Sequence, residues 1–526
     1  MATIIEARSP FSNEAIRTFA DDADAASLAA ALDRARAHLG TSYPVIIDGE
    51  PRETVATIVS RNPARPHEIV GHVGSASLEQ ATEAIEAAAR RFETWKRVPA
   101  NERADILFGA ADLVRRRRDD FNALLVLEVG KPWVEADADT AEAIDFLEFY
   151  GREAIRYAKP SPLVPYAGEE STLAYIPLGV GVVIPPWNFA FAIMAGMTAA
   201  ALVAGNTVVL KPSSDSPVIA AVFVDLLREA GLPPGVVNFV PGSGRAIGDA
   251  IVAHAKTRFI AFTGSKEVGL RINELAAKTQ PQQIWIKRVI AEMGGKDSIV
   301  VAADADLDAA ADGIVASAFG FSGQKCSACS RAIVERSVAA ALEAKIVDRV
   351  ARLRVGDPVS AGVSMGPVIN ESAMTTMLTY IERGIAEGGR LIAGGRRAPG
   401  DGFFLEPTII ADVAPEGTIA QEEIFGPVLA LIVADDFVHA LAIANNTEFG
   451  LTGALYTSDP QKLERAEVDF HVGNLYFNRK CTGALVGVHP FGGFNMSGTD
   501  SKAGGYDYLQ LFTQAKMVAR RLPRGA

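Results

Sequence analysis

One cysteine lies among glycines and small polar residues, in the string Gly323-Gln-Lys-Cys326 that is followed by Ser327. A cysteine that fills a core is normally flanked by apolar residues, whereas a reactive one needs partial exposure and neighbours that favour the thiolate. Lys325 and Arg331 are close enough in sequence to supply such neighbours. The pattern therefore predicts that Cys326 is a nucleophile.

The same cysteine has a second interpretation, because Cys326 and Cys329 have the C-x-x-C spacing of a redox pair or of half a zinc site. A zinc site of the common type needs a second pair of ligands. The chain has three cysteines, Cys481 being the third, and none of its seven histidines lies near Cys326 in sequence. We therefore predict no metal site and keep the redox pair as the alternative.

The bulk composition limits the class of protein. A chain of 526 residues is too long for one core, so two or three domains are expected. A net charge of −12 offers no general attraction to nucleic acid or to an anionic membrane, and neither is expected as a partner. The first residues lack the apolar stretch of a secretory signal, which favours a cytoplasmic location and reduced thiols.

Residues 171–210 carry no charged side chain, and a hydropathy window would flag part of them as a membrane span. Prolines and glycines break this stretch into a strand (180–184), a loop, a short buried helix and a second strand (207–210). It therefore reads as the interior of an α/β domain.

Apolar β-branched runs alternate with amphipathic segments, which predicts a parallel sheet covered by helices on both faces in a Rossmann-like layout. The expected strands are 181–184, 206–210, 236–240 and 258–262, with helical segments at 77–96, 101–129 and 217–230. The alternation begins again at 298–301, 332–334 and 473–477, which predicts a second α/β domain that carries Cys326. The junction is expected near Glu292. The run of arginines at 115–118 reads as a solvated helix face.

Six separated sequence strings together carry a family resemblance: Pro186-Trp-Asn-Phe189, Leu210-Lys-Pro212, Phe262-Thr-Gly-Ser265, Glu292-Met-Gly-Gly-Lys296, Gly323-Gln-Lys-Cys326 and Glu422-Glu-Ile-Phe-Gly-Pro427. Their order and spacing resemble the aldehyde dehydrogenase superfamily over essentially the whole chain. Residues 478–487, followed by Pro490-Phe-Gly-Gly493 and Ser497-Gly-Thr499, resemble the narrower family of L-glutamate γ-semialdehyde dehydrogenases.

The resemblance implies an α/β aldehyde dehydrogenase fold with a Rossmann-like cofactor domain, an α/β catalytic domain and a β oligomerisation flap. The expected boundaries are 1–157 and 176–291 for the dinucleotide-binding domain, 292–509 for the catalytic domain, and 158–175 with 510–526 for the flap. A homo-oligomer follows, either a dimer or a trimer of dimers. Docking of a separate proline dehydrogenase stays open.

The same resemblance assigns the catalytic roles. Cys326 is expected to add to the aldehyde carbon, and the Asn188 amide with the Cys326 N–H to hold the resulting oxyanion. Glu292 is expected to activate the water that hydrolyses the thioester. From the residues alone, Asn188 also fits a loop turn and Glu292 a capping or surface carboxylate.

The resemblance implies NAD as the cofactor. The residues expected to bind it are Lys211, Ser214, Gly264, Ser265, Glu423 and Phe425. Ser214 stands where many NAD-preferring relatives carry a glutamate that repels a 2′-phosphate, so we expect NADP to be tolerated and the preference to be narrow. The string Gly242-Ser-Gly244 with Gly248 is one residue too long for the G-x-G-x-x-G pattern.

The narrower resemblance implies L-glutamate γ-semialdehyde as the substrate, oxidised to L-glutamate in proline catabolism. The residues expected to bind it are Glu142, Phe189, Ser327, Gly483, Ala484 and Phe491. Without the resemblance, the phenylalanines fit an ordinary core, Glu142 a solvated helix face, and His489 a structural histidine. The rival functions are oxidation of another ω-semialdehyde or an aliphatic aldehyde, and binding without turnover.

Overall fold

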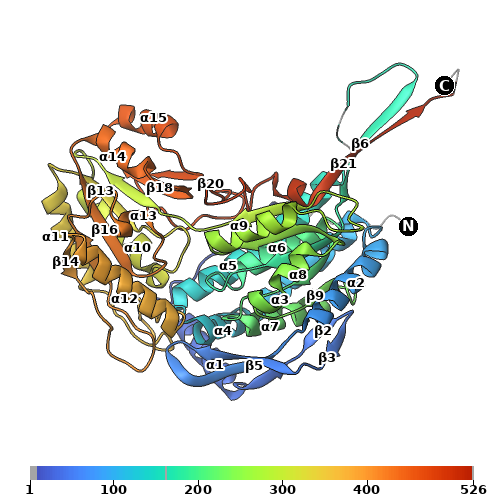
Figure 1. The fold of residues 1–526 in the computed structure, drawn as a ribbon, viewed down its shortest axis with the longest axis horizontal. Coiled ribbons are helices and arrows are strands. Elements are labelled where there is room, and N and C mark those ends of the chain that lie inside the picture. The colour runs from blue at the N-terminus through green and yellow to red at the C-terminus, as the bar shows by residue number, and fades with distance from the viewer. Residues whose placement is uncertain (1–8, 160, 162, 524–526) are drawn as a thin grey trace.

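The computed structural model describes residues 9–159, residue 161 and residues 163–523. Two seven-stranded sheets, each flanked by helices, form the two halves of the molecule (Figure 1). This arrangement confirms the expected α/β fold.

The first sheet has the strand order β11-β10-β7-β8-β9-β2-β3. Its strands are β11 (Arg288–Glu292), β10 (Thr257–Thr263), β7 (Val180–Ile184), β8 (Thr207–Leu210), β9 (Val237–Phe239), β2 (Val45–Ile47) and β3 (Glu50–Arg52). The first five are parallel to one another, β2 is antiparallel to β9, and β3 is antiparallel to β2. Val182 and Val183 are both fully buried, but they belong to different cores because successive side chains of a strand face opposite sides of the sheet.

The helices on the two faces of this sheet come from residues 78–277. They are α2 (Leu78–Trp95), α3 (Ala100–Arg116), α4 (Arg118–Val129), α5 (Trp133–Tyr157), α6 (Ala192–Val203), α7 (Pro217–Glu229), α8 (Asp249–Ala253) and α9 (Lys266–Ala277). The Val182 core includes residues of α2, α8 and α9, and the Val183 core includes residues of α3 to α7. Helices therefore cover both faces, as the sequence predicts.

The arginine run differs from its prediction in two ways. The segment 101–129 is not one helix, because Arg117 leaves the helical conformation between α3 and α4. Only Arg116 behaves as a simple exposed charge. The other three arginines make ion pairs with carboxylates: Arg115 with Glu14 and Glu148, Arg117 with Glu229, and Arg118 with Asp137.

The second sheet has the order β14-β15-β16-β13-β12-β18-β19 and is parallel except at the β14–β15 pair. Its strands are β14 (Arg390–Ala393), β15 (Thr408–Ala411), β16 (Val428–Ala434), β13 (Arg331–Glu335), β12 (Ser298–Val301), β18 (Thr452–Tyr456) and β19 (Asn474–Phe477). Its helices are α10 (Leu307–Phe319), α11 (Ala339–Val350), α12 (Glu371–Ala386), α13 (Thr418–Gln421), α14 (Phe437–Asn445) and α15 (Pro460–Asp469). Cys326 lies between α10 and β13, in the second half of the molecule as predicted.

The smaller elements lie around these two halves: α1 (Asp22–Ala37), a sheet of β1 (Thr41–Tyr43), β5 (Arg65–Ser75) and β4 (Ala56–Asn62), and the pair β17 (Phe449–Gly450) and β20 (Phe494–Asn495). The antiparallel pair β6 (Glu169–Pro177) and β21 (Thr513–Arg521) projects from the body of the protein (Figure 1). These two strands come from segments that are far apart in sequence.

The uncharged stretch 171–210 forms most of β6, then β7, α6 and β8. Among the described residues, no helix has the length and apolar character needed to cross a membrane. From β7 onward the stretch is the interior of the first domain, as its prolines and glycines indicate. The prediction is wrong for the residues in β6, which are exposed or half-buried because this strand pairs only with β21 outside the body of the protein.

Candidate active site

Two cavities meet at Cys326. The larger is a cleft of about 2000 Å³, and the smaller is a cavity of about 790 Å³. Cys326 and Thr263 line both of them. A molecule in one cavity and a molecule in the other can therefore approach the same sulfur atom.

The Cys326 thiol is half-buried, but the two cations expected beside it are engaged elsewhere. Lys325 Nζ donates to Glu135 Oε1 at 2.7 Å, and the buried Arg331 guanidinium donates to the carbonyl of Lys296. The prediction that these cations favour the thiolate is therefore wrong. Burial raises the pKa of the Cys326 thiol well above its usual range, with further contributions from nearby carboxylates. The thiol must pass its proton to a base before it attacks.

The other two cysteines are buried beside each other's side chains rather than beside Cys326. Cys329 Sγ donates to the Arg331 carbonyl at 3.4 Å, and Cys481 Sγ donates to the Ser327 carbonyl at 3.4 Å. A redox pair of Cys326 with Cys329 gains no support from these contacts. No group of three or more His, Cys, Asp or Glu side chains in the described part of the chain is arranged to hold a metal ion.

Asn188 is buried at the start of the loop that follows β7, and it lines the larger cleft. Its Nδ2 donates to the carbonyl of Gln324 at 3.1 Å, two residues before Cys326. This bond joins the loop of the first domain to the loop that carries the thiol. It holds the amide of Asn188 at the cleft, beside the cysteine loop.

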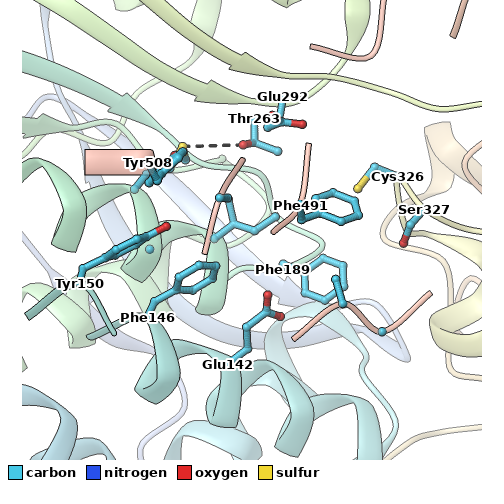
Figure 2. Close-up of a pocket in the computed structure, with 16 residues that line it drawn as sticks. Glu142, Phe146, Tyr150, Phe189, Thr263, Glu292, Cys326, Ser327, Phe491 and Tyr508 are labelled. Carbon is cyan, nitrogen blue, oxygen red and sulfur yellow. Dashed lines mark hydrogen bonds between the residues drawn. The ribbon is translucent and has the colours of Figure 1, made fainter. Parts of the chain in front are cut away.

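Glu292 is the last residue of β11, and it lines the smaller cavity with Cys326 (Figure 2). Its Oε1 accepts a hydrogen bond from the Ser501 hydroxyl, and its Oε2 is buried without a hydrogen-bond partner in the structure. Burial raises the pKa of Glu292 to about 8, and the Ser501 hydrogen bond opposes that shift. Glu292 is therefore neither a helix cap nor a surface carboxylate.

The raised pKa of Glu292 gives a pH prediction. A general base acts only when it is deprotonated, and its pKa of about 8 means that it is mostly protonated at pH 7. We expect kcat to rise by up to about tenfold per pH unit as the pH approaches 8, and to level off above it. Steady-state rates between pH 6 and 9.5 measure this; a flat profile across that range would show that no such base limits turnover.

All six residues expected to bind the cofactor line the larger cleft: Lys211, Ser214, Gly264, Ser265, Glu423 and Phe425. Ser265 is the N-cap of α9, and its Oγ accepts from Val268 N at 3.4 Å. A helix N-terminus facing a cleft is a site for phosphate oxygens. Glu423 Oε1 accepts from Gly295 N at 3.0 Å, and burial raises the pKa of this carboxyl to about 7.

All six residues expected to bind the substrate line the smaller cavity: Glu142, Phe189, Ser327, Gly483, Ala484 and Phe491. Figure 2 shows the Glu142 carboxyl pointing toward Phe189 and Phe491, whose rings lie between it and Cys326. Burial raises the pKa of Glu142 to about 8, so this residue is not on a solvated face. Both phenylalanines are only half-buried, which distinguishes them from residues of an ordinary core.

Several residues at the site have no predicted role. Thr263 ends β10 inside one of the family strings, so its position was visible in the sequence. Tyr150 and Tyr508 line the smaller cavity from segments far apart in sequence, and no local pattern marks either one. Lys131 is fully buried against the Phe189 ring, at 4.3 Å from Nζ to the ring centroid.

His489 is predicted to be structural. In the structure its Nδ1 accepts a hydrogen bond from Leu485 N at 3.3 Å.

The comparisons with known proteins agree with this geometry. A model of the aldehyde dehydrogenase family matches residues 50–518. A protein of Geobacillus thermodenitrificans named 1-pyrroline-5-carboxylate dehydrogenase is 57% identical over 510 residues, which cover 97% of this chain and 99% of that protein. The crystal structure of a 1-pyrroline-5-carboxylate dehydrogenase from Thermus with bound NAD is 49% identical, with a TM-score of 0.96, and the match covers 98% of this chain and 100% of that one.

A third relative is longer than this chain. Proline utilization A from Bdellovibrio bacteriovorus is 44% identical with a TM-score of 0.96, and the match covers 98% of this chain but 54% of that one. The family model spans most of the sequence, and full-length relatives share about half of its residues. The chain therefore belongs to the aldehyde dehydrogenase family.

Proposed function

We propose that this enzyme oxidises L-glutamate γ-semialdehyde, the open form of pyrroline-5-carboxylate, to L-glutamate with NAD+ in proline catabolism. The observation that carries the proposal is the meeting of two cavities at Cys326, with the cofactor residues along one and the substrate residues along the other. The relatives named 1-pyrroline-5-carboxylate dehydrogenase support the choice of substrate.

The first step is addition, because an aldehyde carbon cannot easily release hydride while it is trigonal. The Cys326 thiol passes its proton to solvent water in the cleft, its sulfur bonds to the aldehyde carbon, and the carbonyl π electrons move to oxygen. The Asn188 amide and the Cys326 N–H then stabilise this oxyanion, each by about 3 to 4 kcal/mol. The buried position of Asn188, anchored to the Gln324 carbonyl, keeps this donor in place.

Bound NAD+ supplies the acceptor for the hydride that leaves the tetrahedral carbon. The cleft suits a dinucleotide because three kinds of group line it: the capped N-terminus of α9, the amine of Lys211 and the carboxylate of Glu423. Lys211 and Glu423 are proposed to hold the two riboses, and Phe425 to contact the nicotinamide. The product of this step is a thioester at Cys326.

Hydrolysis completes the cycle. Glu292 accepts a proton from water, the water oxygen attacks the thioester carbon, and the C–S bond breaks to return the Cys326 sulfur and free glutamate. The buried Oε2 of Glu292, which has no hydrogen-bond partner in the structure, is available to take that proton.

The head of the amino-acid substrate is proposed to lie at the other side of the smaller cavity. Ser327 and the N–H groups of Gly483 and Ala484 would bind its α-carboxylate, and Glu142 would lie near its α-ammonium. Phe189 and Phe491 would enclose the methylene groups between head and aldehyde. A plain aliphatic aldehyde would leave these polar groups without partners.

Steady-state kinetics test this function. We expect a kcat/KM for pyrroline-5-carboxylate that exceeds the values for butanal and for ω-semialdehydes without the amino-acid head. A preference for one of those aldehydes would replace our substrate assignment with the rival one. No reduction of NAD+ by any of them would favour a binding protein.

Ser214 gives a prediction on cofactor choice. It lines the cleft as a small neutral side chain, so nothing at this position repels a 2′-phosphate. We expect NAD and NADP to differ by less than about 100-fold in kcat/KM, and Ser214→Glu to lower kcat/KM for NADP by about tenfold or more through charge repulsion. Ser214→Ala is the matched control, because it changes size without adding charge. If Ser214→Glu affected both nucleotides equally, Ser214 would not contact the ribose.

We also propose a homo-oligomer assembled through β6 and β21. A two-stranded sheet on its own is marginally stable in water, and this one exposes apolar side chains such as Met517 and Val518. Light scattering distinguishes a dimer from a trimer of dimers.

A cytoplasmic location is proposed because the mechanism needs a reduced Cys326. The match to proline utilization A supports transient contact with a proline dehydrogenase.

A further inference from the structure

The loop after β19 is fixed by one guanidinium. Arg479 follows β19 by two residues, and its Nη2 donates to the carbonyl of Thr482 at 3.1 Å and to the carbonyl of Gly483 at 3.2 Å. These are the carbonyls of two successive peptide groups. One rigid cation therefore sets the orientation of both.

The orientation of the carbonyls fixes that of the N–H groups. In a trans peptide the C=O of one residue and the N–H of the next point in opposite directions, and the described chain has no cis peptide bond. With the Thr482 and Gly483 carbonyls turned toward Arg479, the N–H groups of Gly483 and Ala484 point away from it. Gly483 and Ala484 line the smaller cavity.

Gly483 has the backbone conformation that such a turn requires. Its φ is +78°, in the left-handed region that glycine adopts without strain. Successive N–H groups around a left-handed residue form a concave receptor for an anion. In the described structure neither N–H has a hydrogen-bond acceptor from the protein, so both are free to bind one in the cavity.

Arg479 is itself held in place by its surroundings. Its guanidinium carbon lies 4.5 Å from the centroid of the Tyr476 ring, and Tyr476 belongs to β19 and is buried. The ring of this sheet residue supports the cation, so the position of Arg479 does not depend on a bound ligand.

We propose that Arg479 is a positioning residue for substrate recognition, which turns the N–H groups of Gly483 and Ala484 into the cavity as the receptor for the substrate's carboxylate. Arg479 acts through these two peptides and does not touch the substrate. The inference rests on the proposed function, since that function supplies the carboxylate. Its specific consequence is that Arg479 contributes to binding of the amino-acid head and not to the aldehyde chemistry.

The test compares Arg479→Lys and Arg479→Met with the intact enzyme on two substrates, pyrroline-5-carboxylate and butanal. Lysine keeps the charge but lacks the planar fork that reaches two carbonyls, and methionine removes both. We expect both variants to raise KM for pyrroline-5-carboxylate by about tenfold or more, the equivalent of one charged hydrogen bond. We expect kcat/KM for butanal and KM for NAD+ to change by less than about threefold.

The control is Lys480→Met, which removes one positive charge from the same loop. The Lys480 side chain lies beside Gly483 but, among the described residues, donates no hydrogen bond to the Thr482 or Gly483 carbonyl. This variant should leave KM for pyrroline-5-carboxylate within about threefold of the intact enzyme. Butanal turnover also reports whether each variant has folded, and crystal structures of the Arg479 variants should show the two peptides rotated.

Three results would overturn the inference. Equal losses on both substrates would mean a general structural role, and an unchanged KM for pyrroline-5-carboxylate would mean no role. If Arg479→Met raised KM for pyrroline-5-carboxylate and Arg479→Lys did not, the positive charge alone would matter and not the planar fork. If the unmodified enzyme did not oxidise pyrroline-5-carboxylate, the proposed function would fail first, so the two failures are distinguishable.

Discussion

Replacing Cys326 by alanine is expected to lower kcat/KM for pyrroline-5-carboxylate by at least about 10⁴-fold. Without the sulfur the aldehyde carbon stays trigonal, and hydride loss from it would produce an acylium ion. The other groups of the site cannot replace a nucleophile, because Asn188 only stabilises charge that has already formed. Nucleotide reduction measured by absorbance, at enzyme concentrations high enough to detect slow turnover, gives the rate.

Two controls separate loss of chemistry from loss of structure. Cys326 lies at the boundary of the two cavities, so Cys326→Ala should bind NAD+ within a few-fold of the intact enzyme, as followed by fluorescence titration. Cys329→Ala removes a buried sulfur three residues away; it should keep most of the activity and lose about 1 kcal/mol of stability. A Cys326→Ala enzyme with an unchanged rate would eliminate the covalent mechanism.

Mass spectrometry gives an independent measurement of the same step. During turnover, the intact enzyme should carry an acyl group on a peptide that spans Cys326, and the alanine variant should carry none. An acyl group found on Cys329 or Cys481 instead would assign the role of nucleophile to that cysteine. Both of these thiols are buried, so we do not expect this result.

The regular parts of the fold were predictable because their signals are local. The strand predicted at 180–184 matches β7, and that at 207–210 matches β8, since short apolar runs between glycines and prolines define their own ends. The break at Arg117 was not predictable, because no glycine or proline marks it and arginine is a good helix former. On either side of the break, Arg115 and Arg118 pair with carboxylates that are distant in sequence, which no local pattern reveals.

The candidate site was predictable as a set of residues but not as an electrostatic environment. The family strings identified Cys326, Asn188 and Glu292, and the structure places all three along the two cavities. The expectation for Lys325 failed because proximity in sequence does not determine where a side chain points; its amine faces Glu135. The raised pKa of Glu292 depends on burial by segments far apart in sequence, which no local pattern reveals.

Replacing Glu292 by glutamine should separate the two halves of the reaction. The amide has nearly the same shape and can still accept the Ser501 hydrogen bond, but it cannot take a proton from water. Thioester formation should continue while hydrolysis stops. We therefore expect a burst of about one reduced nucleotide per active site, followed by a steady rate lower by about 10² to 10⁴-fold. Rapid mixing with absorbance detection resolves the two phases.

The acylated enzyme that accumulates offers a chemical control. Hydroxylamine is a nucleophile that cleaves thioesters without a general base, so adding it should restore turnover in Glu292→Gln far more than in the intact enzyme. A variant that lost the burst together with the steady rate, and that hydroxylamine did not rescue, would assign Glu292 to an earlier step. Glu292 would then be the base that receives the proton of Cys326, whose raised pKa requires one.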